Sequence, residues 1–234
     1  MATLVWGARL SMRRLRMRGK GRRFAAGWWV LLACWVLLPA VACAKGPAAP
    51  AAKGPVLVVG DSLSAAHNIP VQDGWVNLLG QRLKQQMKAP PAVVNASISG
   101  ETTSGALTRL PGLLARHTPS VVVIELGGND ALRGLTPAQL HGNLEKMIQL
   151  SRDAGAKVLL LGIDVPPNYG PAYRQRLRAS YAELAKKYDV ALLPFLLEGV
   201  ALQPGLMQAD GLHPTAAAQP KLLDNVWPVL EPLL

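Results

Sequence analysis

The stretch that decides the fold runs from Val56 to Ser64 and reads VLVVGDSLS. Its first four residues are aliphatic and stop at Gly60-Asp61-Ser62, a pattern that predicts a buried strand ending in a tight turn. Ser62 then projects from the carboxyl end of a strand, which is where open α/β sheets place their chemistry. The stretch therefore predicts both a parallel α/β sheet and a candidate nucleophile.

A second polar segment, DGLHP, lies near the other end of the chain at residues 210–214. Its carboxylate precedes its imidazole by three residues, so Asp210 can orient the His213 ring from within one short loop. A serine needs such a base, because its hydroxyl is a weak nucleophile on its own. Ser62, His213 and Asp210 thus have the residue types of a nucleophile, its general base and the carboxylate that orients the base.

Apolar runs alternate with amphipathic stretches after residue 55. Strands are expected at Val56–Val59, Ala92–Val94, Val121–Leu126, Lys157–Gly162 and Val190–Leu193, and helices at Trp75–Met87, Ser104–Ala115, Pro137–Ala154, Ala172–Tyr188 and, interrupted by prolines, Ala216–Leu234. Strands that are apolar on both faces and separated by helices indicate a parallel sheet covered on both sides. The expected fold is a three-layer α/β/α sandwich with a five-stranded parallel sheet in the order 2-1-3-4-5.

That strand order places the loops after the second and third strands beside Ser62. These loops contain Gly100 and Asn129, in the segments SISGETTSG and GGND. An ester carbonyl becomes an oxyanion in the tetrahedral intermediate, which fixed hydrogen-bond donors stabilise. Gly and Asn are common in turns, so each alone indicates only a loop. Together, on the two loops that flank Ser62, they predict an oxyanion hole formed by the N–H groups of Ser62 and Gly100 and the side-chain amide of Asn129.

Four segments, GDSLS, SISGETTSG, ELGGND and DGLHP, resemble the four sequence blocks of the SGNH, or GDSL, hydrolase family. The match covers essentially all of residues 56–234, and no block departs from the family at a catalytic position. Three further segments, GGNDALRGL, NYG and LLPF, resemble the periplasmic acyl-CoA thioesterase, lysophospholipase and arylesterase members of that family. The resemblance implies that Ser62, Asp210 and His213 form a catalytic triad and that Gly100 and Asn129 are oxyanion donors. The α/β-hydrolase elbow Gly-x-Ser-x-Gly fits less well, because Ser64 stands in place of its second glycine.

The family resemblance also implies an activity, a serine esterase that hydrolyses carboxylic esters and thioesters, lysophospholipids among them, through an acyl-serine intermediate. Apolar residues in the loops after the third and fourth strands predict an acyl-binding wall that includes Leu132, Leu135, Pro167 and Tyr169. Two alternatives share the same fold. One is an acetylesterase for O-acetylated glycans, and the other is an inactive lipid- or glycan-binding module.

Residues 1–44 differ in character from the rest of the chain. Eight Lys and Arg residues and no acidic residue lie between Arg9 and Arg23, ahead of the apolar run Ala25–Val41. A basic start, an apolar core and small residues before position 45 are typical of a secretory signal peptide. A retained membrane anchor and lipidation of Cys43 are the alternatives. Residues 45–55 are expected to form a linker rich in Pro, Ala and Gly, and residues 56–234 the hydrolase domain of a periplasmic or secreted protein.

The net charge of +11 comes mostly from this leader, because eight positive charges leave with it and the remainder carries +3. The basic isoelectric point is therefore no sign of a nucleic-acid partner, and none is expected. The partner expected is a small acyl ester or thioester. We expect a monomer that contacts a membrane only through its leader or through a lipid substrate.

Other titratable residues have simpler interpretations. Asp61 is expected to bond its own backbone in the turn, and Glu125, at the end of an apolar strand, to accept backbone amides of the Ser62 loop. Three histidines lack the spacing of metal ligands and are expected to be solvated or capping residues: His67, His117 and His141. No metal site and no cofactor is expected.

Overall fold

Five parallel strands form one sheet in the order β2-β1-β3-β4-β5, as the sequence predicts. The computed structural model describes residues 54–234, so the expectations for the signal peptide and for most of the linker lie outside the described residues. The strands are β1 (Val56–Gly60), β2 (Val93–Asn95), β3 (Val121–Glu125), β4 (Lys157–Leu161) and β5 (Ala191–Leu193).

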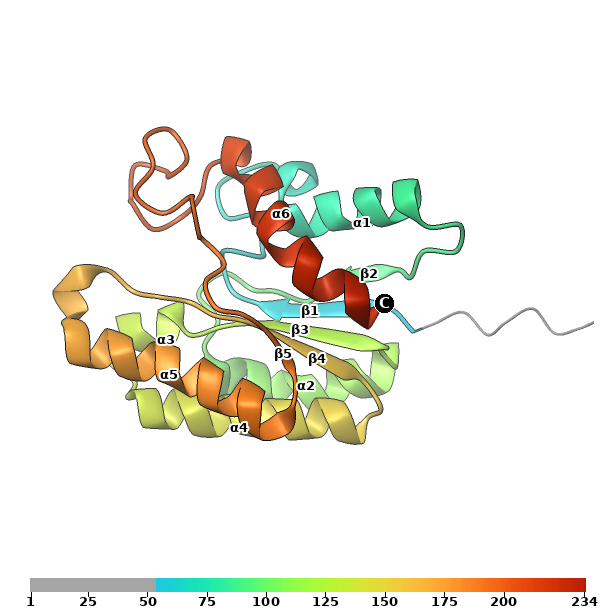
Figure 1. Ribbon diagram of the computed structural model, residues 1–234, viewed down its shortest axis with the longest axis horizontal. Helices are drawn as coiled ribbons and strands as arrows, with labels where there is room; N and C mark the ends of the chain where they lie inside the picture. Colours follow the sequence, from blue (N-terminus) through green and yellow to red (C-terminus); the bar gives the residue numbers. More distant parts are fainter. Residues whose placement is uncertain (1–53) are drawn as a thin grey trace, which may run out of the picture. The chain divides into compact units, whose positions relative to one another are not determined.

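Helices cover both faces of this sheet and make a three-layer α/β/α domain (Figure 1). The α-helices are α1 (Trp75–Gln86), α2 (Thr103–His117), α3 (Gly128–Leu132), α4 (Pro137–Asp153), α5 (Pro171–Tyr188) and α6 (Gln219–Leu230), and the 3-10 helices are η1 (Val71–Asp73), η2 (Pro167–Tyr169), η3 (Ala216–Ala218) and η4 (Glu231–Leu233). α1 and α6 pack on one face of the sheet, and α2, α4 and α5 on the other. Within residues 54–234, no helix has the length and apolar character needed to cross a membrane.

β1 and β3 lie at the centre of the core, and every residue in both strands is buried. They pair in parallel from Val56 opposite Val121 to Gly60 opposite Glu125. Apolar residues on both faces are what a sheet covered by two helical layers requires. The register brings the carboxyl ends of the two strands to one edge, where the loops that follow them meet.

Local sequence signals account for the helix ends. Thr136 and Gln139 form the expected capping box at the start of α4. After α4, Gly155 adopts a positive φ of 81°, and the N–H groups of Gly155 and Ala156 bond back to Arg152 and Ser151, which closes the helix with a Schellman motif. Pro220 does not interrupt α6, because it lies in the first turn, where its missing N–H has no helical partner to lose.

The short helix α3 is the main element that the sequence analysis did not predict. Its segment reads GNDAL, which is typical of a turn, and it is only five residues long.

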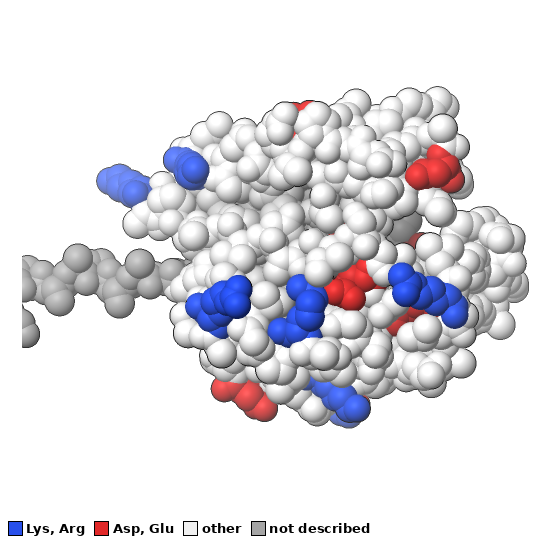
Figure 2. All heavy atoms as spheres, turned by 180° about the vertical axis from the view of Figure 1, so that it is seen from behind, with Lys and Arg blue, Asp and Glu red and all other residues white. Residues whose placement is uncertain are grey.

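Charged residues of the domain are interspersed on the face shown in Figure 2, where Lys and Arg lie among Asp and Glu.

Candidate active site

Ser62 lies in the turn that follows β1, at the carboxyl edge of the sheet. The turn is held by Asp61, whose Oδ1 accepts the Leu63 N–H at 3.0 Å, as the sequence predicts. Gly60 is required before it: a Cβ there would lie 2.8 Å from both Glu125 Oε2 and Ser64 Oγ. The absence of a side chain at residue 60 therefore lets β3 and the serine loop approach each other.

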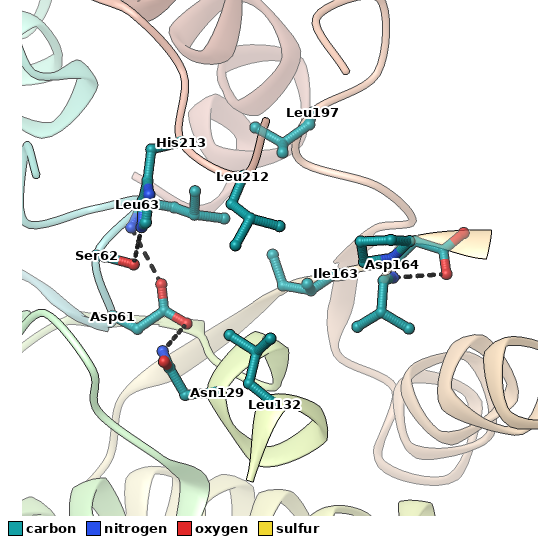
Figure 3. Close-up of a pocket in the computed structure, with 13 residues that line it drawn as sticks. Asp61, Ser62, Leu63, Asn129, Leu132, Ile163, Asp164, Leu197, Leu212 and His213 are labelled. Carbon is teal, nitrogen blue, oxygen red and sulfur yellow. Dashed lines mark hydrogen bonds between the residues drawn. The ribbon is translucent and has the colours of Figure 1, made fainter. Parts of the chain in front are cut away.

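The structure brings Ser62, His213 and Asp210 into one hydrogen-bonded chain. His213 Nε2 lies 2.9 Å from Ser62 Oγ (Figure 3). His213 Nδ1 lies 2.7 Å from Asp210 Oδ2. The Asp210 Oδ1 accepts the N–H groups of Leu212 and His213 at 2.9 and 3.1 Å. The hydrogen bond from the His213 side chain, helped by the Leu212 N–H, lowers the pKa of Asp210 to about 2. Asp210 is thus a carboxylate at neutral pH and can orient the imidazole.

Gln208 forms hydrogen bonds both to the loop that contains His213 and to the loop that follows Ser62. Its Nε2 donates to the carbonyl oxygens of His67 and Pro214 at 2.9 and 3.0 Å. Its backbone N–H donates to the His213 carbonyl at 2.7 Å. Because one amide group bonds both loops, Gln208 limits how far His213 can move from Ser62. Its position two residues before Asp210 gave no signal of this role.

His67 packs against the His213 imidazole, a contact that the sequence analysis did not predict. The centroids of the His67 and His213 rings are 4.3 Å apart, with the planes tilted by 40°. The His67 Nδ1 also lies 3.3 Å from Ser99 Oγ. His67 therefore forms a wall beside His213, and its ring connects the loops that follow β1 and β2.

Two of the expected oxyanion donors, Ser62 and Asn129, line the same pocket. Asn129, in the first turn of α3, donates from Nδ2 to Asp61 Oδ2 at 3.0 Å, so a buried carboxylate orients its amide. Gly100 has a φ of 81°, and its carbonyl accepts Arg133 Nη2 at 2.8 Å. Within residues 54–234, the N–H groups of Ser62 and Gly100 donate to no protein acceptor. They are free to bind a developing oxyanion.

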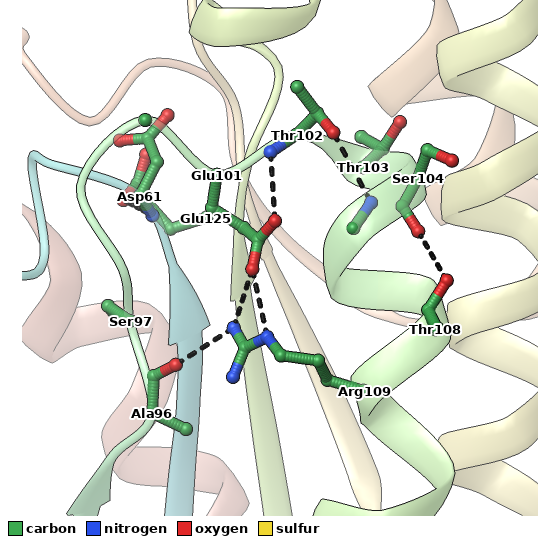
Figure 4. A network of polar contacts seen from close by, with 12 residues as sticks. Asp61, Ala96, Ser97, Glu101, Thr102, Thr103, Ser104, Thr108, Arg109 and Glu125 are labelled. Carbon is green, nitrogen blue, oxygen red and sulfur yellow. Dashed lines mark hydrogen bonds and ion pairs between the residues drawn. The ribbon is translucent and has the colours of Figure 1, made fainter.

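An ion pair between Glu101, next to Gly100, and Arg109, in the middle of α2, braces the Gly100 loop. Glu101 accepts Arg109 Nε at 2.9 Å, and Arg109 Nη2 also donates to the Ala96 carbonyl at 3.1 Å (Figure 4). Thr102 caps α2 by accepting the Gly105 N–H. These bonds hold the loop from both ends, which reduces the cost of fixing Gly100 when a ligand binds.

Two buried carboxyl groups lie beneath the serine. Asp61 is 2% exposed and Glu125 is fully buried. Glu125 Oε2 accepts the Asp61 N–H at 3.2 Å, which confirms the expected bond to the serine loop, and it also accepts Ser64 Oγ at 2.7 Å. Burial raises the pKa of Asp61 to about 6, against the lowering effect of its bonds from Leu63 and Asn129. Burial, and next the nearby Asp61 charge, raises the pKa of Glu125 well above its ordinary value.

A pocket of about 100 Å³ opens beside Ser62, Asn129 and His213. Its other walls are mostly aliphatic and include Leu63, Leu132, Ile163, Val165, Leu197 and Leu212. Of the residues expected to bind substrate, Leu132 lines this pocket and Pro167 lines a neighbouring cavity. Leu135 and Tyr169 line neither; the Leu135 carbonyl instead accepts the Tyr173 hydroxyl at 2.9 Å.

A parallel α/β sheet with Ser, His and Asp at its carboxyl edge defines a serine hydrolase of the SGNH type. Residues 58–219 match the model of the GDSL-like lipase/acylhydrolase family, and the chain belongs to that family. It is 57% identical over 184 residues to the esterase TesA of Pseudomonas aeruginosa, covering 79% of this chain and 91% of that protein. It is 46% identical over 184 residues to thioesterase 1/protease 1/lysophospholipase L1 of Escherichia coli, covering 79% and 86%. The crystal structure of a psychrotrophic Pseudoalteromonas esterase, EstA, inhibited by monoethylphosphonate, superposes with a TM-score of 0.73 at 37% identity, covering 77% of this chain and 98% of that one.

Proposed function

We propose that this serine esterase acts on medium- to long-chain acyl esters and thioesters, lysophospholipids among them, with Ser62 as its nucleophile. The observation that carries the proposal is the hydrogen-bonded chain from Asp210 through His213 to Ser62, at the mouth of an aliphatic pocket. A serine hydroxyl needs its base within hydrogen-bond reach, and the base needs an orienting group in turn. The distances from His213 Nε2 to Ser62 Oγ, 2.9 Å, and from His213 Nδ1 to Asp210 Oδ2, 2.7 Å, meet that requirement.

The geometry supports a two-step mechanism. Ser62 Oγ attacks the carbonyl carbon while His213 Nε2 takes the hydroxyl proton, and Asp210 stabilises the imidazolium that results. The oxyanion accepts hydrogen bonds from the Ser62 N–H, the Gly100 N–H and the Asn129 amide. The imidazolium gives its proton to the departing alcohol or thiol, which leaves an acyl group on Ser62. Water then loses a proton to His213, attacks the acyl carbon and releases the carboxylic acid.

The pocket walls favour an alkyl chain over an acetylated sugar. Each methylene buried against aliphatic walls contributes about 0.8 kcal/mol, so affinity rises with chain length. Sugar recognition relies on stacked aromatic rings and on several hydrogen-bonding side chains. Aliphatic side chains form most of this pocket, and no Phe, Tyr or Trp is among the described residues that line it.

The first experiment compares Ser62→Ala with Ser104→Ala, a matched change at an exposed serine on α2. We expect Ser62→Ala to abolish turnover and labelling by a fluorophosphonate probe, with an unchanged melting temperature, and Ser104→Ala to retain both. Residual activity of Ser62→Ala within tenfold of the wild type would remove Ser62 as the nucleophile. In the wild type, kcat/KM should rise with p-nitrophenyl acyl length beyond four carbons, and an optimum at acetate would refute the acyl-chain proposal.

We further propose that the protein is exported, that its leader is cleaved after Ala44, and that it acts as a monomer in the periplasm. The basic and apolar pattern of residues 1–44 supports export. Mass spectrometry of the amino terminus tests this directly, since cleavage gives a chain beginning at Lys45 and lipidation gives one beginning at a modified Cys43. An intact leader on a cytoplasmic protein would contradict the proposal.

A further inference from the structure

Arg133 lies at the rim of the active site, beside the Gly100 loop. It follows directly after Leu132, the last residue of α3, yet the two side chains make different contacts. Leu132 lines the catalytic pocket (Figure 3). Arg133 Nη2 instead donates to the Gly100 carbonyl at 2.8 Å. The mechanism described above gives the Arg133 side chain no role.

The strand order separates the aliphatic pocket from the Gly100 loop. β2 and β3 flank β1 on opposite sides, and β4 lies beyond β3. The pocket takes most of its aliphatic walls from α3 and from the loops that follow β4 and β5, and none of the described residues in the loop after β2 lines it. The acyl chain and the alcohol leave the ester carbon in different directions. With the acyl chain in the pocket, the alcohol therefore lies toward β2.

The Arg133 guanidinium is available to an anion on that side. It is exposed and forms no ion pair with any residue between positions 54 and 234. Glu101, beside Gly100, is already engaged in the ion pair that braces the loop. Asp130 is buried and accepts two hydrogen bonds from Thr103. The Gly100 carbonyl uses one of the five N–H donors of a guanidinium, so the others are free to bind a ligand.

The contact with Gly100 places this cation close to the reacting ester. A Cβ on Gly100 would lie 3.5 Å from Arg133 Nη2, so the guanidinium lies against that residue. The Gly100 N–H is one of the proposed oxyanion donors. In the part of the chain that the structure describes, the neighbouring Ser99 N–H also donates to no acceptor. The rim thus offers a guanidinium and a backbone N–H to an anion held near the ester.

The distance between ester and phosphate distinguishes two of the proposed substrate classes. A guanidinium binds phosphate oxygens through paired hydrogen bonds. In a lysophospholipid, only the glycerol backbone separates the scissile ester from the phosphate. In a coenzyme A thioester, the long pantetheine arm separates the scissile bond from the phosphates. A cation beside an oxyanion donor fits the first arrangement.

We propose that Arg133 binds the phosphate of a lysophospholipid leaving group, with the Ser99 N–H as a second donor, and that it favours these esters over uncharged glycerol esters. This inference rests on the proposed function and adds a leaving-group site to it. The acyl chain then lies toward β4 and the phosphate toward β2. Selectivity for the alcohol is set by a residue that does not contact the acyl chain.

The test changes Arg133 and compares two esters that differ only in the phosphate group. Arg133→Met removes the charge and keeps the bulk, and Arg133→Lys keeps the charge without the paired donors. Arg116→Met, the same change at an exposed arginine in the last turn of α2, is the control. The substrates are 1-decanoyl-glycero-3-phosphocholine and 1-decanoylglycerol, below the concentrations at which they aggregate, with decanoyl-coenzyme A as a third. Melting temperatures show whether each variant is folded.

The measured quantity is the ratio of kcat/KM for the phosphocholine ester to kcat/KM for the glycerol ester. Losing the bond to the Gly100 carbonyl affects both esters equally and cancels in this ratio. An exposed ion pair contributes up to about 1 kcal/mol, which is about fivefold in kcat/KM. We expect Arg133→Met to lower the ratio about fivefold, Arg133→Lys to lower it less, and Arg116→Met to leave it unchanged. Added salt should lower the ratio in the wild type and not in Arg133→Met, because salt screens exposed charges.

Three results would overturn the assignment. An equal loss with both glycerol esters would limit Arg133 to bracing the Gly100 loop. A loss confined to decanoyl-coenzyme A would place a different phosphate at this residue. An equal fall of the ratio in Arg116→Met would make the effect one of overall charge. If the wild type hydrolyses none of the three substrates, it is the proposed function that fails.

Discussion

Replacing Asp61 by asparagine should make the protein much less active and should change how its stability depends on pH. The Asp61 carboxylate is 2% exposed and holds two donors, the Leu63 N–H and the Asn129 amide, each at 3.0 Å. Asparagine at this position has one acceptor oxygen, and its NH₂ group would face a donor. One of the two bonds is then lost, and the Asn129 amide is no longer oriented.

The loss of activity follows from the role proposed for Asn129. Removing one oxyanion donor lowers kcat by about a hundred- to a thousandfold. Misorienting the donor through Asp61→Asn should approach the lower end of that range, with KM changed little. A kcat within threefold of the wild type would show that Asp61 does not orient the donor.

The change in pH dependence follows from the pKa of the same group. Burial raises the pKa of Asp61 from 3.8 to about 6, so the folded protein binds more protons than the unfolded chain between these values. The stability that this contributes is complete below pH 3.8 and is lost as the pH rises through about 6. At 1.36 kcal/mol for each pKa unit, the charged carboxylate costs up to about 3 kcal/mol at pH 7, and Asp61→Asn removes that cost.

Urea denaturation at pH 4 and at pH 7 measures the effect. The unfolding free energy of the wild type should fall relative to that of Asp61→Asn as the pH rises between these values. Asp153→Asn, a change at the exposed last residue of α4, serves as the control and should follow the wild type. Parallel pH dependences in the wild type and Asp61→Asn would refute the assignment of a raised pKa to Asp61.

Substitutions at three further positions test the other parts of the site. Asp210→Asn should lower kcat about a thousand- to ten-thousandfold, because His213 loses its orienting carboxylate; a loss below tenfold in steady-state kinetics would remove Asp210 from the triad. Asn129→Ala should cost a hundred- to a thousandfold, mostly in kcat, whereas an effect on KM alone would assign Asn129 to substrate binding. His67→Ala should lower kcat about two- to tenfold, the value of an aromatic contact, and His67→Phe should restore it, while equal losses in both would rule out ring packing as the reason.

Much of the fold could be predicted from local sequence. The run Val56–Val59 is aliphatic on both faces, which only a strand buried between two helical layers allows. Thr136 and Gln139 mark a helix start because capping is a contact between residues three apart. The Asp210–His213 pair is equally local, since its hydrogen bond lies within one loop.

The sequence by itself therefore determined the strands, most of the helices, the order of the sheet and the residue types of the catalytic chain. These features depend on contacts between near neighbours or on topological rules for parallel strands. Local sequence did not predict the helix α3. Its segment carries the turn signals of GGND, and its five residues are too few to show the periodicity of a helix.

Only the tertiary structure decided how the site is held. His67 and His213 are far apart in the chain, yet their rings lie 4.3 Å apart. Asn129 is 68 residues from the Asp61 carboxylate that orients it. No periodic pattern encodes such contacts, because each arises where separate loops meet at the carboxyl edge of the sheet. Burial of Asp61 and Glu125, and with it their raised pKa values, exists only once β1 and β3 are packed side by side between the helices.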